Sequence, residues 1–481
     1  EATAVVRLTR VEGGLTTVSD EAVGQLRSRL RGRLWTANEP GADPLRPVFN
    51  AMHDAEPGLT VSCVGTADVV QAVNFARENG LLVAVRGGGH SIAGLSNTDG
   101  GMLLDLSPMR GVLVHPERNT AEVQGGALWG DVDHETQLFG LATPGGIVSD
   151  TGVAGLTLGG GYGWIRRKYG LSCDNLVEAQ VVCADGSVRR ASSESHPDLY
   201  WALRGGGGNF GIVTTFTFRL HPVGPVVAFA GTIYEIDDIG KVLRGWGEYT
   251  REAPDEVTSS MAAITFPALP EVPDAVHHRA CAVVAAVYAG DVDEGMKVLE
   301  PLRRLASPIV DLSGPWPYSV VQSAFDVILP RHEVQSYWSS QYVDDLSDEV
   351  VEVLSAITLD RPAPLVEVGV WHLEGAISRV DPEETAFAQR SAPFLVSIEG
   401  NWHDSSFNHR GIAWVRAAHN RVHAVGTGAG YLNFTGLDGG DVRSGVDAAL
   451  GRNLDRLAAV KAIYDAQNFF RLNNNIAPAP S

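Results

Sequence analysis

The sequence predicts an α+β protein built from more than one domain, and three observations lead to this expectation. The chain has 481 residues, which is more than a single hydrophobic core usually organises. Helical and strand patterns follow one another along its whole length. Glycine is dense up to residue 211 but sparse from about 226 to 430, where six of the ten tryptophans lie. We therefore expect units at 1–222, 223–430 and 431–481.

In the first unit, apolar residues from Val69 to Ala76 recur at helical spacing. Thr66 can cap this helix, which we expect to end at Gly80. Residues 81–85 form an apolar run typical of a strand, and residues 214–220 alternate with period two, which also predicts a strand. Further elements are expected as short strands at 113–115, 121–123 and 179–184 and as a helix at 197–203.

The second unit combines strands with helices. Pro222 and Pro225 separate it from the first unit, because proline interrupts regular structure. Strands are expected at 282–288 and 365–372, and helices at 291–305 and 347–356. The last segment is expected to contain a helix at about 443–462 followed by an irregular tail.

Composition excludes several classes of protein. The formal charge of −20 disfavours nucleic acid and anionic membrane as partners, and no apolar run approaches the ~18 residues that a membrane span needs. The four cysteines are widely spaced and predict neither a zinc site nor a disulfide framework. His419 and His423 have no evident third ligand, so no metal is expected. The chain begins at Glu1, which carries no information about targeting, and a cytoplasmic location is the expectation.

The most informative motif is Arg-Gly-Gly-Gly-His-Ser at residues 86–91. Three consecutive glycines destabilise a helix or a strand, because glycine loses the most backbone freedom on ordering. They suit a sharp turn whose N–H groups face a ligand, typically a phosphate.

A second glycine-rich element covers residues 144–164. It is too apolar for a flexible linker and too rich in glycine for a helix, which indicates either main chain packed against a large flat ligand or a tightly turned structural loop. Residues 206–211 match the GxGxxG string of dinucleotide-binding proteins. A helix-like stretch precedes them and a strand-like one follows, which is the reverse of the order that a Rossmann site needs.

Four motifs together carry a resemblance to a known family. They are RGGGHS (86–91), VSDTGVAGLTLGGGYGWIRRKYGLSCDNL (148–176), DLYWALRGGGGNFGIVT (198–214) and YDAQNFFRLNNNI (464–476). In this respect the chain resembles the FAD-linked oxidases of the berberine bridge enzyme type, within the vanillyl-alcohol oxidase/PCMH superfamily. The resemblance implies a PCMH-type FAD-binding domain, made of the N-terminal half in two subdomains plus the C-terminal tail. An α+β substrate domain with an antiparallel sheet is inserted between them.

The resemblance also implies where FAD binds. The loop like RGGGHS wraps the FAD pyrophosphate with the N–H groups of Gly87, Gly88 and Gly89, and His90 is bonded covalently to the flavin 8α-methyl. An imidazole nitrogen is a suitable nucleophile for that activated methyl group. The expected FAD-binding residues are Arg86, Gly87, Gly88, Gly89, His90, Ser91, Gly152, Gly155, Gly159, Gly161, Tyr162, Gly163, Gly211, Ile212, Val213, Asn473 and Asn475.

Two further positions refine this expectation. Many relatives bind flavin C6 through a cysteine whose place is taken here by Val148, so the resemblance implies a single covalent bond. Cys173 does not match that position and is expected to pack near the flavin. Thr151 stands at the family's oxygen-gating position, where a small side chain permits O2 to reach the flavin and so favours an oxidase.

Residues 431–434 resemble the family's Tyr-x-Asn-Tyr motif, which implies that Tyr431 and Asn433 lie near the flavin ring. The second tyrosine, a base in some relatives, is Phe434 here. Tyr431 is therefore the better candidate for the base, although a tyrosine acts as one only if its pKa is lowered.

Residues 371–379 resemble the strand of the substrate sheet that faces the flavin. Alternation puts His372 and Glu374 on one face of it, so His372 is a candidate base or substrate hydrogen-bond donor, with a structural role as the alternative. The carboxylate base of the alkaloid-cyclising members aligns with Arg379, which argues against that chemistry.

The sequence thus predicts an FAD-dependent oxidase with covalent flavin. It would oxidise an alcohol, an amine or a phenol-like small molecule (a secondary metabolite, a sugar or an aromatic amine), with O2 as acceptor giving H2O2. Two alternatives stay open: a flavin dehydrogenase with another acceptor, and a non-catalytic flavin-fold binding protein. The expected partners are the small-molecule substrate and O2, and the sequence does not set the oligomeric state.

Overall fold

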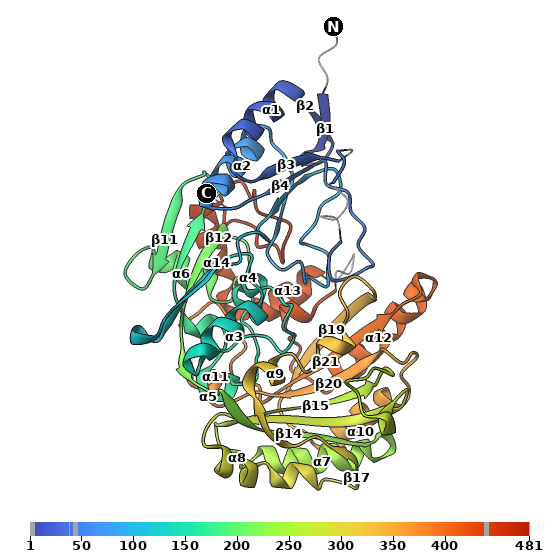
Figure 1. The fold of residues 1–481 in the computed structure, drawn as a ribbon. Helices are drawn as coiled ribbons and strands as arrows, with labels where there is room; N and C mark the ends of the chain where they lie inside the picture. Colours follow the sequence, from blue (N-terminus) through green and yellow to red (C-terminus); the bar gives the residue numbers. More distant parts are fainter. Residues whose placement is uncertain (1–4, 38, 42–46, 437–441, 481) are drawn as a thin grey trace.

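The computed structural model describes residues 5–37, 39–41, 47–436 and 442–480. Within them, three larger sheets form successive tiers of an elongated molecule, with the N-terminal sheet at one end and a large antiparallel sheet at the other (Figure 1). The predicted α+β class is confirmed. Two short strand pairs accompany the sheets, β1 (Val5–Thr9) with β2 (Leu15–Ser19) and β9 (Leu141–Ala142) with β13 (His221–Pro222).

The first tier leads the chain into the RGGGHS loop. Its strand order is β3 (Arg33–Thr36), β4 (Leu59–Ser62), β6 (Met102–Asp105) and β5 (Val83–Arg86), and β4, β6 and β5 run parallel. Helices α1 (Asp20–Arg29) and α2 (Thr66–Glu78) pack on it. The predicted cap at Thr66 is wrong by one residue, because Gly65 is the N-cap. The predicted strand at 81–85 begins later, since Leu81 instead bridges to Arg10.

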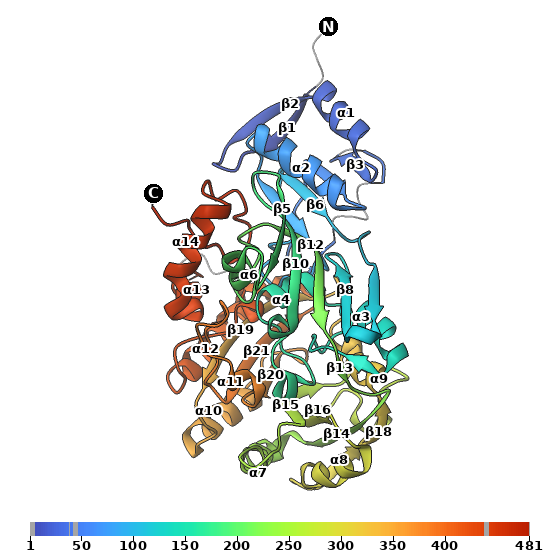
Figure 2. The ribbon, with the colours of Figure 1, turned by 90° about the vertical axis from the view of Figure 1, so that its left-hand side faces the viewer.

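The second tier is an entirely antiparallel sheet of five strands. Their order is β11 (Val188–Ser192), β10 (Leu176–Val182), β12 (Ile212–Arg219), β8 (Thr120–Gln124) and β7 (Val112–His115). Helix α3 (Trp129–Thr136) and α6 (Pro197–Leu203) share its apolar core with the C-terminal helices α13 (Val442–Leu450) and α14 (Leu454–Tyr464). The chain therefore returns to this tier at its end (Figure 2). The single helix predicted at 443–462 is two helices, joined by a turn at Gly451, whose φ is +51°.

The third tier is antiparallel throughout. Its order is β17 (Pro308–Asp311), β14 (Val226–Glu235), β16 (Ala280–Tyr288), β15 (Val257–Thr265), β20 (Glu367–His372), β21 (Phe394–Trp402) and β19 (Gln335–Val343), with β18 (Gly314–Pro317) also paired to β14.

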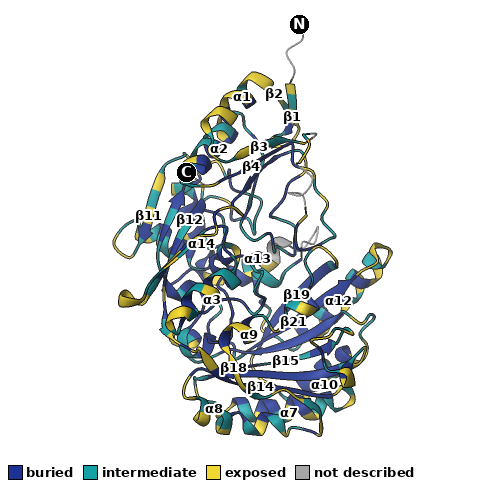
Figure 3. Ribbon diagram, viewed as in Figure 1, coloured by how far each residue is buried: buried dark blue, intermediate teal, exposed yellow. Residues whose placement is uncertain are grey.

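One face of this sheet is covered by helices whose outer sides are exposed (Figure 3). They are α7 (Ile239–Thr250), α8 (Val292–Val298), α10 (Asp348–Leu359) and α12 (Asn408–His423). The helix predicted at 291–305 ends at Val298, and Pro301 then sits in a short 3-10 turn because it has no N–H to continue the helix. No described helix has both the length and the apolar character needed to cross a bilayer.

Candidate functional site

A cavity of about 360 Å³ lies where the three tiers meet. One side of it is formed by residues of the segments 87–96, 146–164 and 205–213 together with residues of the C-terminal segment 470–474. The other side is the uncovered face of the large sheet, from β15, β16, β20 and β21, and the segment 431–435. The glycine-rich elements of the first half thus face the side chains of the second.

Most residues that the sequence assigned to FAD line this cavity. Arg86, Gly161, Gly163 and Asn475 belong to the same segments but do not form its wall. The assigned residues in the wall are Gly87, Gly88, Gly89, His90, Ser91, Gly152, Gly155, Gly159, Tyr162, Gly211, Ile212, Val213 and Asn473, and Val148, Thr151, Tyr431 and Asn433 join them.

The two glycine-rich loops touch main chain to main chain at Gly88 and Gly152. A Cβ on Gly88 would stand 2.4 Å from the Gly152 Cα, and a Cβ on Gly152 would stand 2.4 Å from the Gly88 nitrogen. Gly89 follows with φ of +69°, a conformation that favours glycine. The cavity wall here is therefore bare backbone, the surface that the phosphates of a dinucleotide need. The residues present fit FAD.

His90 is held at this wall by a stacked ring and a carboxylate. Its imidazole stacks on Phe49 with ring centroids 3.8 Å apart, and its Nε2 lies 3.2 Å from Asp150 Oδ1. Arg331 donates to the other Asp150 oxygen at 3.2 Å and to the Gly88 carbonyl at 2.7 Å. Burial acts to raise the pKa of Asp150, but the hydrogen bonds and charges of His90 and Arg331 outweigh it and lower that pKa. Asp150 is therefore an anion beside the imidazole.

Tyr431 and Asn433 lie next to each other against the glycine-rich element 144–164, on the side of the cavity that the large sheet forms. The Tyr431 hydroxyl accepts hydrogen bonds from the Gly161 N–H at 3.0 Å and from Asn433 Nδ2 at 2.7 Å. The Tyr431 ring lies 4.6 Å from the Tyr162 ring. Burial raises the pKa of Tyr431 even though both donors act to lower it, so the phenol keeps its proton at neutral pH.

His372 does not reach the cavity. Strand β20 ends at this residue, and α11 (Ala376–Arg379) follows, so the predicted strand over 371–379 is wrong beyond 372. The chain turns because Gly375 has φ of +60°, and a Cβ there would stand 2.3 Å from the Arg167 carbonyl oxygen. The imidazole is fully buried on the helix-covered face, with Nε2 3.0 Å from Glu374 Oε2, and burial lowers its pKa to about 4.

Two family models and several known proteins match the chain. Residues 57–192 match the family model described as an FAD binding domain, and residues 430–477 match the one described as berberine and berberine like. The FAD-linked oxidoreductase YgaK of Bacillus subtilis is 30% identical over 460 residues, which cover 94% of this chain and 98% of the relative. The chain belongs to the berberine bridge enzyme-like FAD-linked oxidoreductases.

Two further matches are to proteins named as oxidases of 6-hydroxynicotine. The (R)-6-hydroxynicotine oxidase of Paenarthrobacter nicotinovorans is 29% identical over 470 residues, covering 94% of this chain and 98% of that enzyme. The crystal structure of 6-hydroxy-D-nicotine oxidase from Arthrobacter nicotinovorans has a TM-score of 0.81 at 26% identity, covering 94% and 98% of the two chains. The predicted family and enzyme class, an FAD-linked oxidoreductase, are thus confirmed.

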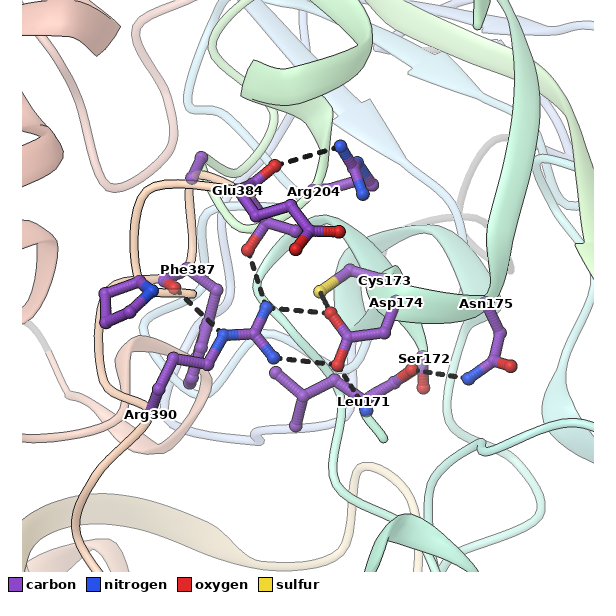
Figure 4. Close-up of polar contacts among 12 residues, drawn as sticks. Leu171, Ser172, Cys173, Asp174, Asn175, Arg204, Glu384, Phe387 and Arg390 are labelled. Carbon is purple, nitrogen blue, oxygen red and sulfur yellow. Dashed lines mark hydrogen bonds and ion pairs between the residues drawn. The ribbon is translucent and has the colours of Figure 1, made fainter. Parts of the chain in front are cut away.

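In this family member, Cys173 belongs to a structural contact rather than to the cavity wall (Figure 4). Its thiol is buried next to the Asp174 carboxylate, and burial raises its pKa. Arg390, from the connection between β20 and β21, donates to both Asp174 oxygens at 2.7 Å, and Asp174 also accepts from the Leu171 N–H. This buried ion pair connects the large antiparallel sheet to the segment that follows the glycine-rich element 144–164.

Sequence reasoning missed several residues of the site. Phe49 and Asp150 hold His90, and Arg331 donates to Asp150. Asp150 lies within the motif 148–176, which did not assign it this role, and Phe49 and Arg331 lie in none of the four motifs. Glu367 and Glu399 line the cavity from the large sheet. Their strands are mostly apolar but also contain other polar residues, so the sequence pattern did not single these two acids out.

Proposed function

We propose that this oxidoreductase is an FAD-dependent oxidase of an alcohol, amine or phenol-like small molecule, with O2 as acceptor and its flavin bonded covalently through His90. The observation that carries the proposal is His90 itself, a cavity residue fixed by Phe49 and Asp150 at the end of the glycine loop. A relative that is named as an oxidase and matches nearly the whole chain supports the choice of reaction.

The hydrogen bond to Asp150 selects the form of the imidazole. An ionised carboxylate accepts a hydrogen bond, so Nε2 is the donor to Asp150, and in the neutral tautomer that fits this bond Nδ1 keeps its lone pair. Among the described residues Nδ1 has no hydrogen-bond partner. A neutral imidazole with one free, oriented nitrogen is the nucleophile that attachment to a flavin methyl group requires.

FAD would be held along the main chain of 87–91, 152–163 and 205–213, with 470–474 closing the site. When bound, it supplies the two-electron acceptor for the substrate. Tyr431 keeps its proton, so we assign its hydroxyl and the Asn433 amide to orienting the substrate rather than to removing a proton. We give His372 no role in the reaction because it lies outside the cavity.

Val148 and Thr151 define the remaining features of the proposal. Both line the cavity. Val148 has no thiol, so one covalent bond to flavin is expected. Thr151 is small, which supports access of O2.

Acid precipitation of the purified protein tests the linkage. Yellow colour should stay in the pellet of the wild type and of Cys173→Ala, and it should pass into the supernatant with His90→Ala. Colour released from the wild-type pellet would contradict the proposed bond. Reduction without air followed by exposure to O2 tests the acceptor, because slow reoxidation would indicate a dehydrogenase. A flavin band that no substrate panel bleaches would indicate a binding protein.

A further inference from the structure

Two glutamates face each other on the cavity side of the large sheet. Glu367 on β20 is the direct register partner of Glu399 on β21, and both line the cavity. Gly369 lies two residues farther along β20 on the same face, and it pairs with Ser397. Because side chains alternate between faces, both carboxyls point away from the helix-covered core that holds Val368 and Ile398.

Both carboxyls are buried, yet neither forms an ion pair with a cation among the described residues. Glu367 is 9% exposed and Glu399 is 8% exposed. The Ser397 hydroxyl hydrogen-bonds Glu399, whereas the Glu367 carboxyl has neither a hydrogen bond nor an ion pair within the described parts of the chain. Arg361 is the cation whose charge acts on Glu367, but its guanidinium donates to the carbonyls of Thr358, Ala263 and Val366.

The two side chains affect each other's ionisation. Burial and the neighbouring Glu399 raise the pKa of Glu367 well above its usual value, and burial raises the pKa of Glu399 to about 7. Like charges this close do not ionise together readily, so near neutral pH the pair tends to share one proton and one negative charge. An uncompensated buried anion of this kind is costly unless a ligand supplies the counter-charge.

Aromatic rings surround the pair on the same wall. Trp338 on β19 is the register partner of Glu399 on its other side and also lines the cavity. Its ring lies 5.7 Å from Phe434 and 6.2 Å from Phe49, the ring that stacks on His90. Carboxylates next to aromatic faces attract organic cations, because the ring face is negative and the apolar body of the cation packs on it.

We propose that Glu367 and Glu399 bind a protonated nitrogen of the substrate, which makes the substrate class a small amine with an aromatic or apolar body. This inference rests on the proposed function in that the cavity is taken as the substrate site of the flavin enzyme. It narrows the range of alcohol, amine and phenol-like compounds to one charge type. A neutral alcohol of the same shape gains no ion pair at this wall, and an anion is repelled by it.

Binding of three matched probes to the purified protein tests the proposal. Benzylammonium, benzyl alcohol and benzoate share one ring and differ in charge. Each is titrated without air into the holoprotein near neutral pH, with isothermal calorimetry as the readout. We expect benzylammonium to bind about tenfold more tightly than benzyl alcohol, as a charged hydrogen bond would give, and benzoate more weakly than both.

Variants locate the effect. Glu367→Gln and Glu399→Gln should each lower benzylammonium affinity about tenfold and change benzyl alcohol affinity less than about twofold. Glu349→Gln, on the exposed side of α10, removes the same charge from the same unit and should change neither.

Equal wild-type affinity for benzylammonium and benzyl alcohol overturns the proposal, and this comparison holds even where a variant does not fold. Unchanged selectivity in folded Glu367→Gln and Glu399→Gln overturns it as well. Calorimetry reads the selectivity independently of turnover, so a flavin-containing protein that binds the probes with this selectivity but does not reoxidise in air refutes the proposed oxidase activity and not this inference.

Discussion

Replacing Glu399 by glutamine should stabilise the protein at high pH and leave its stability at low pH nearly unchanged. Burial raises the pKa of Glu399 from 4.5 to about 7, and one pKa unit corresponds to about 1.36 kcal/mol. Ionising this carboxyl therefore costs about 3 kcal/mol more in the folded chain than in the unfolded one. The amide has the same shape and no charge to bury.

The direction with pH follows from proton binding. Between about pH 4.5 and 7 the folded state holds a proton on Glu399 that the unfolded state has lost, so the free energy of unfolding of the wild type falls as pH rises through this window. The free energy of unfolding of Glu399→Gln does not fall in this way, because glutamine does not ionise. Its advantage should be near zero around pH 4.5 and approach about 3 kcal/mol well above pH 7.

Urea unfolding of holoprotein below and above this window measures the difference, with Glu349→Gln as the exposed control. A Glu399→Gln variant that is no more stable than the wild type at high pH, or whose gain is the same at both pH values, would refute the assignment of Glu399 as a costly buried carboxyl. The same variant is expected to bind benzylammonium more weakly. Gain of stability with loss of binding is the signature of a group kept for its ligand.

Three further changes test other parts of the site. Asp150→Asn should lower the fraction of flavin that stays in the acid pellet while FAD still binds, because the amide can donate to Nε2 and no longer fixes the histidine tautomer; an unchanged fraction would contradict this role. Gly88→Ala should lower the free energy of unfolding by about 1–3 kcal/mol and reduce the FAD content, because its Cβ meets the main chain of Gly152. Thermal unfolding and the visible flavin band measure these two effects, and a melting curve like that of the wild type would be evidence against the close approach. Arg390→Met should cost about 3–5 kcal/mol by leaving a buried carboxylate unpaired, whereas exposed Arg452→Met should cost little, and equal denaturant midpoints for the two variants would show that the buried ion pair contributes no more than a surface one.

Local pattern predicted much of the fold. The α6 helix at 197–203 has the predicted bounds, and the strands at 113–115 and 214–220 lie within one or two residues of β7 and β12. These elements carry their own periodicity and turn residues. Boundaries set by tertiary partners were missed, as at residues 371–379, where the Gly375 turn against the Arg167 carbonyl ends the strand and no feature of the strand pattern itself predicts it.

For the site, the sequence by itself determined the glycine-rich loops on one side of the cavity. Runs such as RGGGHS are contiguous, and glycine has few uses besides turns and close backbone approaches, so the loops and His90 could be located and the family inferred from the chain alone. The side-chain half was decided by the tertiary structure. Glu367 and Glu399 are 32 positions apart in the chain and become one charged pair only through the register of β20 and β21. Strand register is fixed by the packing of the whole sheet, so no local stretch of sequence specifies which side chains meet across it.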